Sequence, residues 1–86
     1  MTRLDPDAVV WQEIDGEIVA IDLSTSEYLS LNAAAVVAWP LLARGTTLDD
    51  LVEAVQANFA IPEDRAREDM TEFVTSLRRR RLVTED

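Results

Sequence analysis

Carboxylates are the most numerous side chains in this sequence that can exchange a proton. Seventeen Asp and Glu residues stand among 86, and two pairs are adjacent in helix-like sequence: Asp49 with Asp50, and Glu68 with Asp69. Paired carboxylates support general acid–base catalysis when both face one substrate. Neighbouring residues on a helix diverge by about 100° around its axis, so neither pair shares a face. We interpret both pairs as solvated helix surface.

Two residue types that many catalytic sites need are absent. The chain has no cysteine and no histidine, which excludes thiol nucleophiles, disulfide bonds and the usual zinc ligands. Serine and threonine hydroxyls remain, but without histidine their activation requires another base in a pocket. No phosphate-binding glycine loop, HExxH, CxxC or GxSxG motif occurs. The sequence predicts no catalytic residue, no metal site and no cofactor, so we expect a protein that is not an enzyme.

The charge of the chain argues against nucleic acid as a partner. Its 17 acidic residues outnumber eight basic ones, all arginine, for a formal net charge of −9. Such a chain repels phosphate backbones and anionic membrane surfaces. The run Arg78 to Arg81 is the exception. It is typical of a solvated helix C-terminus, and the alternative is docking of an acidic peptide or partner protein.

The length and composition predict one folded domain over residues 1–86. The chain is 48% hydrophobic, with two Gly and three Pro, which favours a folded core over disorder. The opening residues MTRLDPDAVV do not resemble an export signal. No apolar run approaches the roughly 18 residues that span a bilayer. We therefore expect a soluble cytoplasmic protein without a membrane partner.

Three short apolar runs between Val9 and Leu31 predict an antiparallel meander. Asp15-Gly16 suits a two-residue type I′ turn between the first two strands, because both positions need positive φ. Alternation in the second strand predicts one set facing the core, namely Val19, Ile21 and Leu23. It predicts a second, partly covered set, namely Ile18, Ala20 and Asp22.

The third strand is expected at Glu27 to Leu31, after a polar turn at residues 24–26. Leu29 and Leu31 are expected to point inward, and Tyr28 and Ser30 outward. The strand contains no Pro and no Lys, and one charge near its start is a weak defence against a further strand. Its free edge is therefore suited to pairing with an extended peptide.

Helical sequence begins where the meander ends. Asn32 is a good N-cap before an alanine-rich run, Pro40 is expected to kink that helix or end it early, and Arg44-Gly45 marks its boundary. A second helix is predicted from the capping residue Thr47 to about Phe59. Its apolar face comprises Leu48, Leu51, Val52, Val55 and Phe59.

A third helix is predicted after Pro62, which suits a first helical position. Its apolar stripe comprises Ala66, Met70, Phe73, Val74 and Leu77. Such a stripe usually belongs to the core, and it is also the natural second wall of a cleft beside the third strand. Leu82 and Val83 are expected to form a short extended tail.

The pattern as a whole resembles PqqD-like proteins, also called RiPP recognition elements. The resemblance covers nearly the whole chain, through VVWQEIDGEIVAIDLSTSEYLSLNAAAVVAWPLL, then TLDDLVEAV, then EDMTEFVTSLRRRRLV. Its most specific parts are the strand ending in YLSLN before a helix with a Trp, the TLDDL helix opening, and the helix DMTEFVTSL before a terminal leucine-valine. The sequence departs from the pattern at Pro40, and at Arg81, near which the family often has Gly.

This resemblance implies an α+β fold, a three-stranded antiparallel sheet followed by a three-helix winged-helix-like unit. It implies that the protein binds the leader segment of a ribosomally synthesised precursor peptide, which adds a strand and lies against the third helix. A free-standing acidic member is similar to the leader-binding half of the split B protein of lasso-peptide biosynthesis. The implied partners are then a transglutaminase-like leader peptidase and, after it, the cyclase.

The resemblance also implies the residues that contact the peptide. They are Glu27, Tyr28, Leu29, Ser30, Leu31, Asp69, Met70, Phe73, Val74, Leu77 and Arg78. Two other functions stay open on the sequence. One is a winged-helix nucleic-acid-binding protein with Arg78 to Arg81 on the phosphates. The other is a scaffold subunit of a maturation enzyme that grips no peptide.

Overall fold

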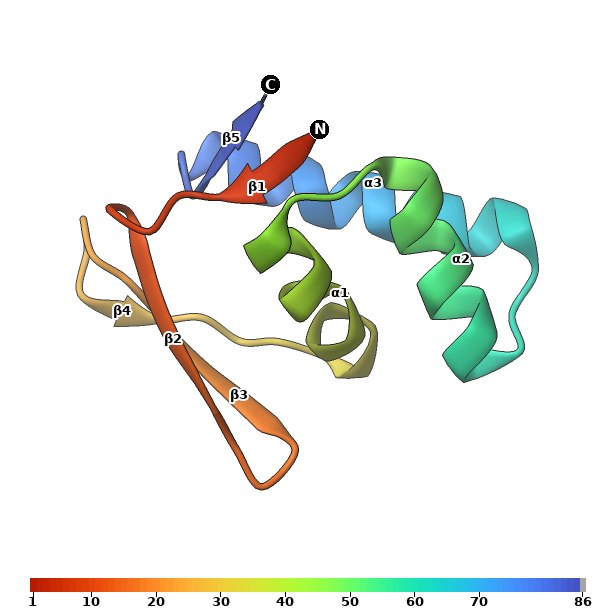
Figure 1. Ribbon diagram of the computed structural model, residues 1–86, viewed down its shortest axis with the longest axis horizontal. Helices are drawn as coiled ribbons and strands as arrows, with labels where there is room; N and C mark the ends of the chain where they lie inside the picture. The colour runs from red at the N-terminus through yellow and green to blue at the C-terminus, as the bar shows by residue number, and fades with distance from the viewer. Residues whose placement is uncertain (86) are drawn as a thin grey trace.

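A three-stranded sheet, a two-stranded sheet and three helices make up the described part of the chain (Figure 1). The computed structural model describes residues 1–85, so the last residue of the domain predicted over residues 1–86 lies outside it. In chain order the elements are β1 (Thr2–Leu4), β2 (Val9–Ile14), β3 (Glu17–Asp22), β4 (Glu27–Tyr28), α1 (Ala33–Arg44), α2 (Leu48–Phe59), α3 (Glu63–Arg79) and β5 (Val83–Glu85).

The predicted antiparallel meander is confirmed. Its strand order is β2-β3-β4, with Val10 opposite Ile21 and Ile21 opposite Tyr28. Asp15 and Gly16 both have positive φ, 52° and 81°, as a type I′ turn requires. Figure 1 shows the β2–β3 hairpin extending away from the helices toward this turn. Residues 11–17, at the far end of the hairpin, are exposed.

The predicted facing of β3 is wrong. Ile18, Ala20 and Asp22 are buried, whereas Val19 is 39% exposed and Leu23 46%. Both sets of the strand contain apolar residues, so alternation alone does not decide which set is buried. The small Ala20 allows close approach to the core, and the Asp22 carboxylate accepts hydrogen bonds from the backbone and hydroxyl of the turn that follows. Because these hydrogen bonds replace those with water, burying the Asp22 carboxylate costs less free energy.

The third strand is shorter than predicted. Regular pairing covers Glu27–Tyr28, and one more backbone bond runs from Leu29 N to Ala20 O, at 2.9 Å. The chain then leaves the sheet because Asn32 starts α1, with its side-chain Oδ1 accepting from Ala35 N at 2.8 Å. The predicted N-cap is confirmed, and it limits how far the strand can run.

Of the two outcomes expected at Pro40, a kink or an early end, the early end is wrong, since α1 continues to Arg44. Proline removes one helical hydrogen bond and crowds the turn before it. Here Pro40 is exposed, while Trp39 and Leu42 on the opposite face are fully buried. Burial of Trp39 before the proline and Leu42 after it stabilises the helix across Pro40. The predicted boundary at Arg44-Gly45 is confirmed.

The second and third helices lie where they were predicted. Thr47 Oγ1 caps α2 by accepting from Asp50 N at 3.2 Å, and α3 begins directly after Pro62. Helix α1 contacts both β1 and α2, and α2 packs against α3. The buried apolar residues form one cluster, comprising Leu4, Val9, Ile18, Ala20, Ala38, Trp39, Leu42, Leu51, Val52, Val55, Ala66, Met70, Val74, Leu77 and Leu82.

The two ends of the described chain pair with each other, which the sequence did not predict. Strands β1 and β5 are antiparallel, with Thr2 opposite Glu85 and Leu4 opposite Val83. Figure 1 shows them at the same edge of the molecule. The predicted extended tail is thus the second strand of a small sheet. Three-residue strands are too short to display a period of two, so their pairing left no pattern in the sequence.

The Glu85 carboxylate joins β5 to two other segments. Its Oε2 accepts from Thr2 Oγ1 at 2.7 Å, and its Oε1 accepts from Arg78 Nε at 2.6 Å. The Thr2 hydrogen bond, followed by that of Arg78, lowers the pKa of Glu85. The folded pKa lies below the unfolded one. The carboxylate therefore contributes stability above the unfolded pKa of about 4.3, and this contribution is lost as the pH falls through the folded pKa.

Replacing Glu85 by Gln is accordingly expected to lower the free energy of unfolding at pH 7 by less than about 1 kcal/mol, because the pair is half exposed to solvent. The difference from wild type should begin to shrink as the pH falls toward about 4.3, and should vanish only below the lowered pKa of folded Glu85. Urea unfolding followed by circular dichroism, at several pH values, measures both. A difference that stays constant with pH would contradict the role assigned to the charge.

Helix α3 ends in a turn that normally requires glycine. Arg81 has φ 60°, its N–H donates to Arg78 O at 2.9 Å, and Leu82 N donates to Leu77 O at 3.0 Å. These are the two bonds of a Schellman motif, whose left-handed residue is usually Gly. The Cβ of a non-glycine residue costs about 1–2 kcal/mol in this conformation. A glycine at this position would therefore relieve backbone strain.

Replacing Arg81 by Gly is expected to raise the free energy of unfolding by about 0.5–1 kcal/mol, since relief of strain exceeds the added chain entropy. Arg79→Gly is the matched control, because it also removes an exposed arginine but places Gly at the last helical residue of α3, where it costs up to about 1 kcal/mol. Thermal unfolding should move in opposite directions for the two variants. Equal destabilisation would contradict a strained Arg81.

Candidate functional site

Strand β4 has one open side. It is the last strand of its sheet, and within residues 1–85 the tail strand β5 pairs with β1 instead. Backbone groups of an antiparallel strand alternate between its two sides. Because Leu29 N–H donates to β3, the backbone groups of Tyr28 and Ser30 are directed to the open side. This edge offers donors and acceptors to a further strand.

A hollow of about 260 Å³ separates this edge from α3. We call it the edge hollow. Its lining residues are Tyr28, Leu29, Ser30, Leu31, Phe73, Ser76, Leu77 and Arg80. A second hollow of about 410 Å³, the Asn32 hollow, lies further toward the start of α3. Its lining residues are Asn32, Ala34, Arg65, Asp69, Met70, Glu72 and Phe73.

Phe73 lines both hollows, and we call the two hollows together the groove along α3. Phe73 is half-buried and its ring centroid lies 6.4 Å from that of the fully buried Trp39. The ring is thus supported from below by the core. The groove has one wall made of backbone edge and one made of helix side chains, the arrangement that strand addition uses.

Most of the predicted site residues lie along this groove, in different states of exposure. Tyr28 is 72% exposed, whereas Met70 and Leu77 are buried and reach the groove only at its floor. Asp69 borders the Asn32 hollow. Glu27 is exposed at the start of β4 but lines neither hollow.

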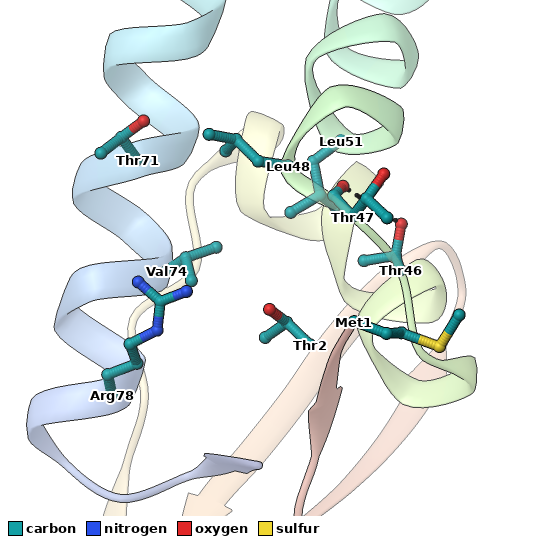
Figure 2. Close-up of a pocket in the computed structure, with 9 residues that line it drawn as sticks. All are labelled: Met1, Thr2, Thr46, Thr47, Leu48, Leu51, Thr71, Val74 and Arg78. Carbon is teal, nitrogen blue, oxygen red and sulfur yellow. Dashed lines mark hydrogen bonds between the residues drawn. The ribbon is translucent and has the colours of Figure 1, made fainter. Parts of the chain in front are cut away.

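Two predicted residues are not brought to the groove. Val74 and Arg78 line a different pocket of about 190 Å³, beside Thr2 and the start of α2 (Figure 2). They are four residues apart, so they share a helix face turned away from Phe73 and Leu77. Val74 is buried there, and Arg78 is engaged by Glu85.

The sequence analysis did not assign six of the lining residues to the site: Asn32, Ala34, Arg65, Glu72, Ser76 and Arg80. The signal for two of them was present, since Ser76 and Arg80 follow Phe73 at offsets of three and seven on one helix face. The helical stripe that indicated this wall contains only apolar residues, so it did not point to these two polar side chains.

Arg80 connects the end of α3 to the sheet. Its Nη1 lies 3.6 Å from Asp22 Oδ2, and the Asp22 side chain is only 3% exposed. The hydrogen bond from the Ser24 hydroxyl lowers the pKa of Asp22, while burial raises it and Arg80 adds a smaller lowering effect. The lowering effects prevail, so this buried carboxyl stays ionised at neutral pH and holds the guanidinium at the mouth of the edge hollow.

The outer face of the sheet, which points away from the core, is apolar and exposed. Large side chains on it include Val10, Ile14, Val19 and Tyr28, and a shallow hollow of about 240 Å³ lies among Val10, Trp11, Gln12, Ile14, Val19 and Ile21. Contiguous exposed apolar surface of this kind is typical of protein contacts. Tyr28 makes this face continuous with the open edge of β4.

Residues 1–85 contain no group of three or more carboxylates placed to hold a metal ion. Within the same range, none of the helices combines the length and the apolar character needed to cross a bilayer.

Comparisons with known proteins agree with this architecture. The family model of coenzyme PQQ synthesis protein D (PqqD) matches residues 17–83. The structure of TbiB1 in complex with the TbiA(beta) leader peptide is 29% identical in sequence, covers 98% of this chain and 99% of its own, and superposes with a TM-score of 0.82. No curated protein matches the chain.

A second structure shares the fold. It is a lasso peptide synthetase B1 complexed with the leader peptide, 24% identical, with 98% of each chain covered and a TM-score of 0.79. The α+β fold predicted from the sequence, with its three-stranded antiparallel sheet and three helices, is confirmed.

Proposed function

The chain belongs to the PqqD family, and from this premise we propose that it is a RiPP recognition element that binds the leader segment of a ribosomally synthesised precursor peptide. The observation that carries the proposal is the open edge of β4 facing the groove on α3. TbiB1, which is similar over nearly the whole chain, has been solved with a leader peptide bound.

The leader adds a fourth strand to the sheet. Its backbone pairs with the outward groups of Tyr28 and Ser30, and its alternate side chains enter the groove. Backbone pairing provides affinity that depends little on sequence, whereas the hollows select side chains. The proposed peptide-binding residues on the strand are Glu27, Tyr28, Leu29, Ser30 and Leu31. Those on the helix are Asp69, Met70, Phe73 and Leu77, now with Ser76 and Arg80.

The protein itself performs no chemistry in this proposal. It holds the precursor for a separate transglutaminase-like leader peptidase and then a cyclase, as in lasso-peptide maturation. The exposed apolar outer face is the surface best suited to contact an enzyme, because it lies beside the bound leader. A nucleic-acid role is less well supported, since the chain carries a net charge of −9 and Arg78 is engaged by Glu85.

Isothermal titration with a synthetic leader, taken from the precursor gene beside this protein's own, tests the proposal. We expect saturable binding of one leader per chain, and clearly weaker binding of a scrambled leader, which keeps backbone pairing but loses the fit of its side chains. Affinity should change little between 50 and 200 mM salt, whereas binding through many phosphate contacts falls by about 10³–10⁵ over that range. Absence of leader binding would overturn the proposal and favour a scaffold role.

A further inference from the structure

The two ends of the groove carry opposite charge. Arg80 lines the edge hollow, at the end where Tyr28 lies. Asp69 and Glu72 line the Asn32 hollow, where Arg65 is the one cation among the lining residues. Between them the lining is largely apolar, around Phe73. A peptide in the groove therefore meets a cation at one end and an excess of carboxylates at the other.

Arg80 remains able to bind a guest carboxylate although it contacts Asp22. A guanidinium has five N–H donors, and one contact of 3.6 Å leaves others free. The Arg80 side chain is 45% exposed. Its neighbours Arg79 and Arg81 are exposed and add positive charge at this end. The three arginines outnumber the two carboxylates there, Asp22 and Glu27.

At the other end the carboxylates are only partly compensated. Asp69 Oδ1 lies 3.6 Å from Arg65 Nε, both on α3. Glu72 is exposed and makes no ion pair with any residue in 1–85. It therefore provides a charge to which a basic guest side chain can bind.

We infer that the groove takes an extended peptide with ordered charges: a basic side chain at the Asn32 end, apolar side chains at Phe73, and an acidic side chain at the Arg80 end. This rests on the proposed function and adds the chemical class of the guest. From Tyr28 to Asn32 an extended strand covers about 13 Å, so the two guest charges are about four residues apart. For a given leader only one strand direction satisfies both ends, so the charges also fix its direction.

Charge also argues against a second copy of the chain as the occupant. Each chain carries a net charge of −9, so two copies repel each other. An extended peptide with both signs of charge complements the groove without this cost.

Charge reversal in matched pairs tests the inference by isothermal titration with the synthetic leader. Arg80→Glu is expected to weaken binding by about five- to tenfold, and Arg79→Glu, on the same turn but outside the groove, by less than about twofold. Glu72→Lys should weaken it by about threefold, and Glu68→Lys, exposed and outside the groove, should not. Because Arg80→Glu faces Asp22, Arg80→Gln serves as a milder variant, and thermal unfolding verifies that each variant is folded.

The outcomes separate the two proposals. If wild type does not bind the leader, the proposed function fails and the charge order fails with it. If wild type binds but Arg80→Glu and Arg79→Glu act equally, the charge order alone is overturned. A leader whose acidic residue at the Arg80 end is replaced by Gln should lose its sensitivity to Arg80→Gln, and a retained sensitivity would equally overturn the order.

Discussion

Replacing Trp39 by Ala is expected to lower the free energy of unfolding by about 3–5 kcal/mol. Trp39 is fully buried and is the largest of the fully buried side chains. Domains have about 5–15 kcal/mol of stability in total, so this loss removes a large fraction of it. Urea unfolding followed by far-ultraviolet circular dichroism measures it without relying on tryptophan fluorescence. Phe73, which rests on this ring, loses its support at the same time.

Two further variants show where the stabilisation comes from. Trp39 Nε1 makes no hydrogen bond within residues 1–85, so packing carries the effect and Trp39→Phe should cost less than half as much. Trp11, which is 37% exposed on the hairpin, is the matched control. Trp11→Ala should cost less than about 1 kcal/mol. Equal losses for the two alanine variants would contradict the assignment of Trp39 to the core.

Replacing Ser30 by Pro is expected to weaken leader binding by tenfold or more, equivalent to about 1.4 kcal/mol. Proline removes the N–H that faces the open side of the edge, and its ring obstructs an approaching strand. Ser30 is exposed and lies beyond the regular pairing of β4, so the fold should survive. Isothermal titration of both proteins with the same leader measures the change.

Ser30→Ala is the control for this experiment, because it removes the hydroxyl and keeps the backbone donor. It should bind as wild type does. Proline at Leu29 would be less informative, since that N–H is already bonded to Ala20 O and its loss disrupts the sheet itself. If Ser30→Pro binds the leader with unchanged affinity and an unchanged circular dichroism spectrum, the edge of β4 is not where the leader pairs.

The features predicted correctly are those set by local chemistry. Asn32 and Thr47 cap helices through their own side chains, and Asp15-Gly16 makes its turn through backbone conformation. The errors arise where distant contacts decide. Burial of one face of β3 depends on which neighbour packs against it, and the continuation of α1 past Pro40 depends on the burial of Trp39.

The site was predictable as a region but not residue by residue. The open edge follows from strand order, which the sequence pattern indicates, and the helix wall follows from a stripe containing Phe73. Because successive helical residues point in different directions, the stripe divides into two faces, one toward the groove and one toward β1. Val74 lies on the face toward β1. Arg80 was hidden in a run of four arginines, which look alike in sequence and differ only in what each one faces.

The pairing of β1 with β5 has a practical consequence for engineering. Thr2 and Glu85 are directly opposite each other, at an edge of the molecule away from β4 (Figure 1). A domain with adjacent ends can be inserted into a loop of a host protein, or circularly permuted, with little distortion of either. An affinity handle or a tethered enzyme attached beside Thr2 or Glu85 would lie on the β1–β5 sheet and not on the β4 edge, so immobilising the domain there should suit screening of precursor libraries.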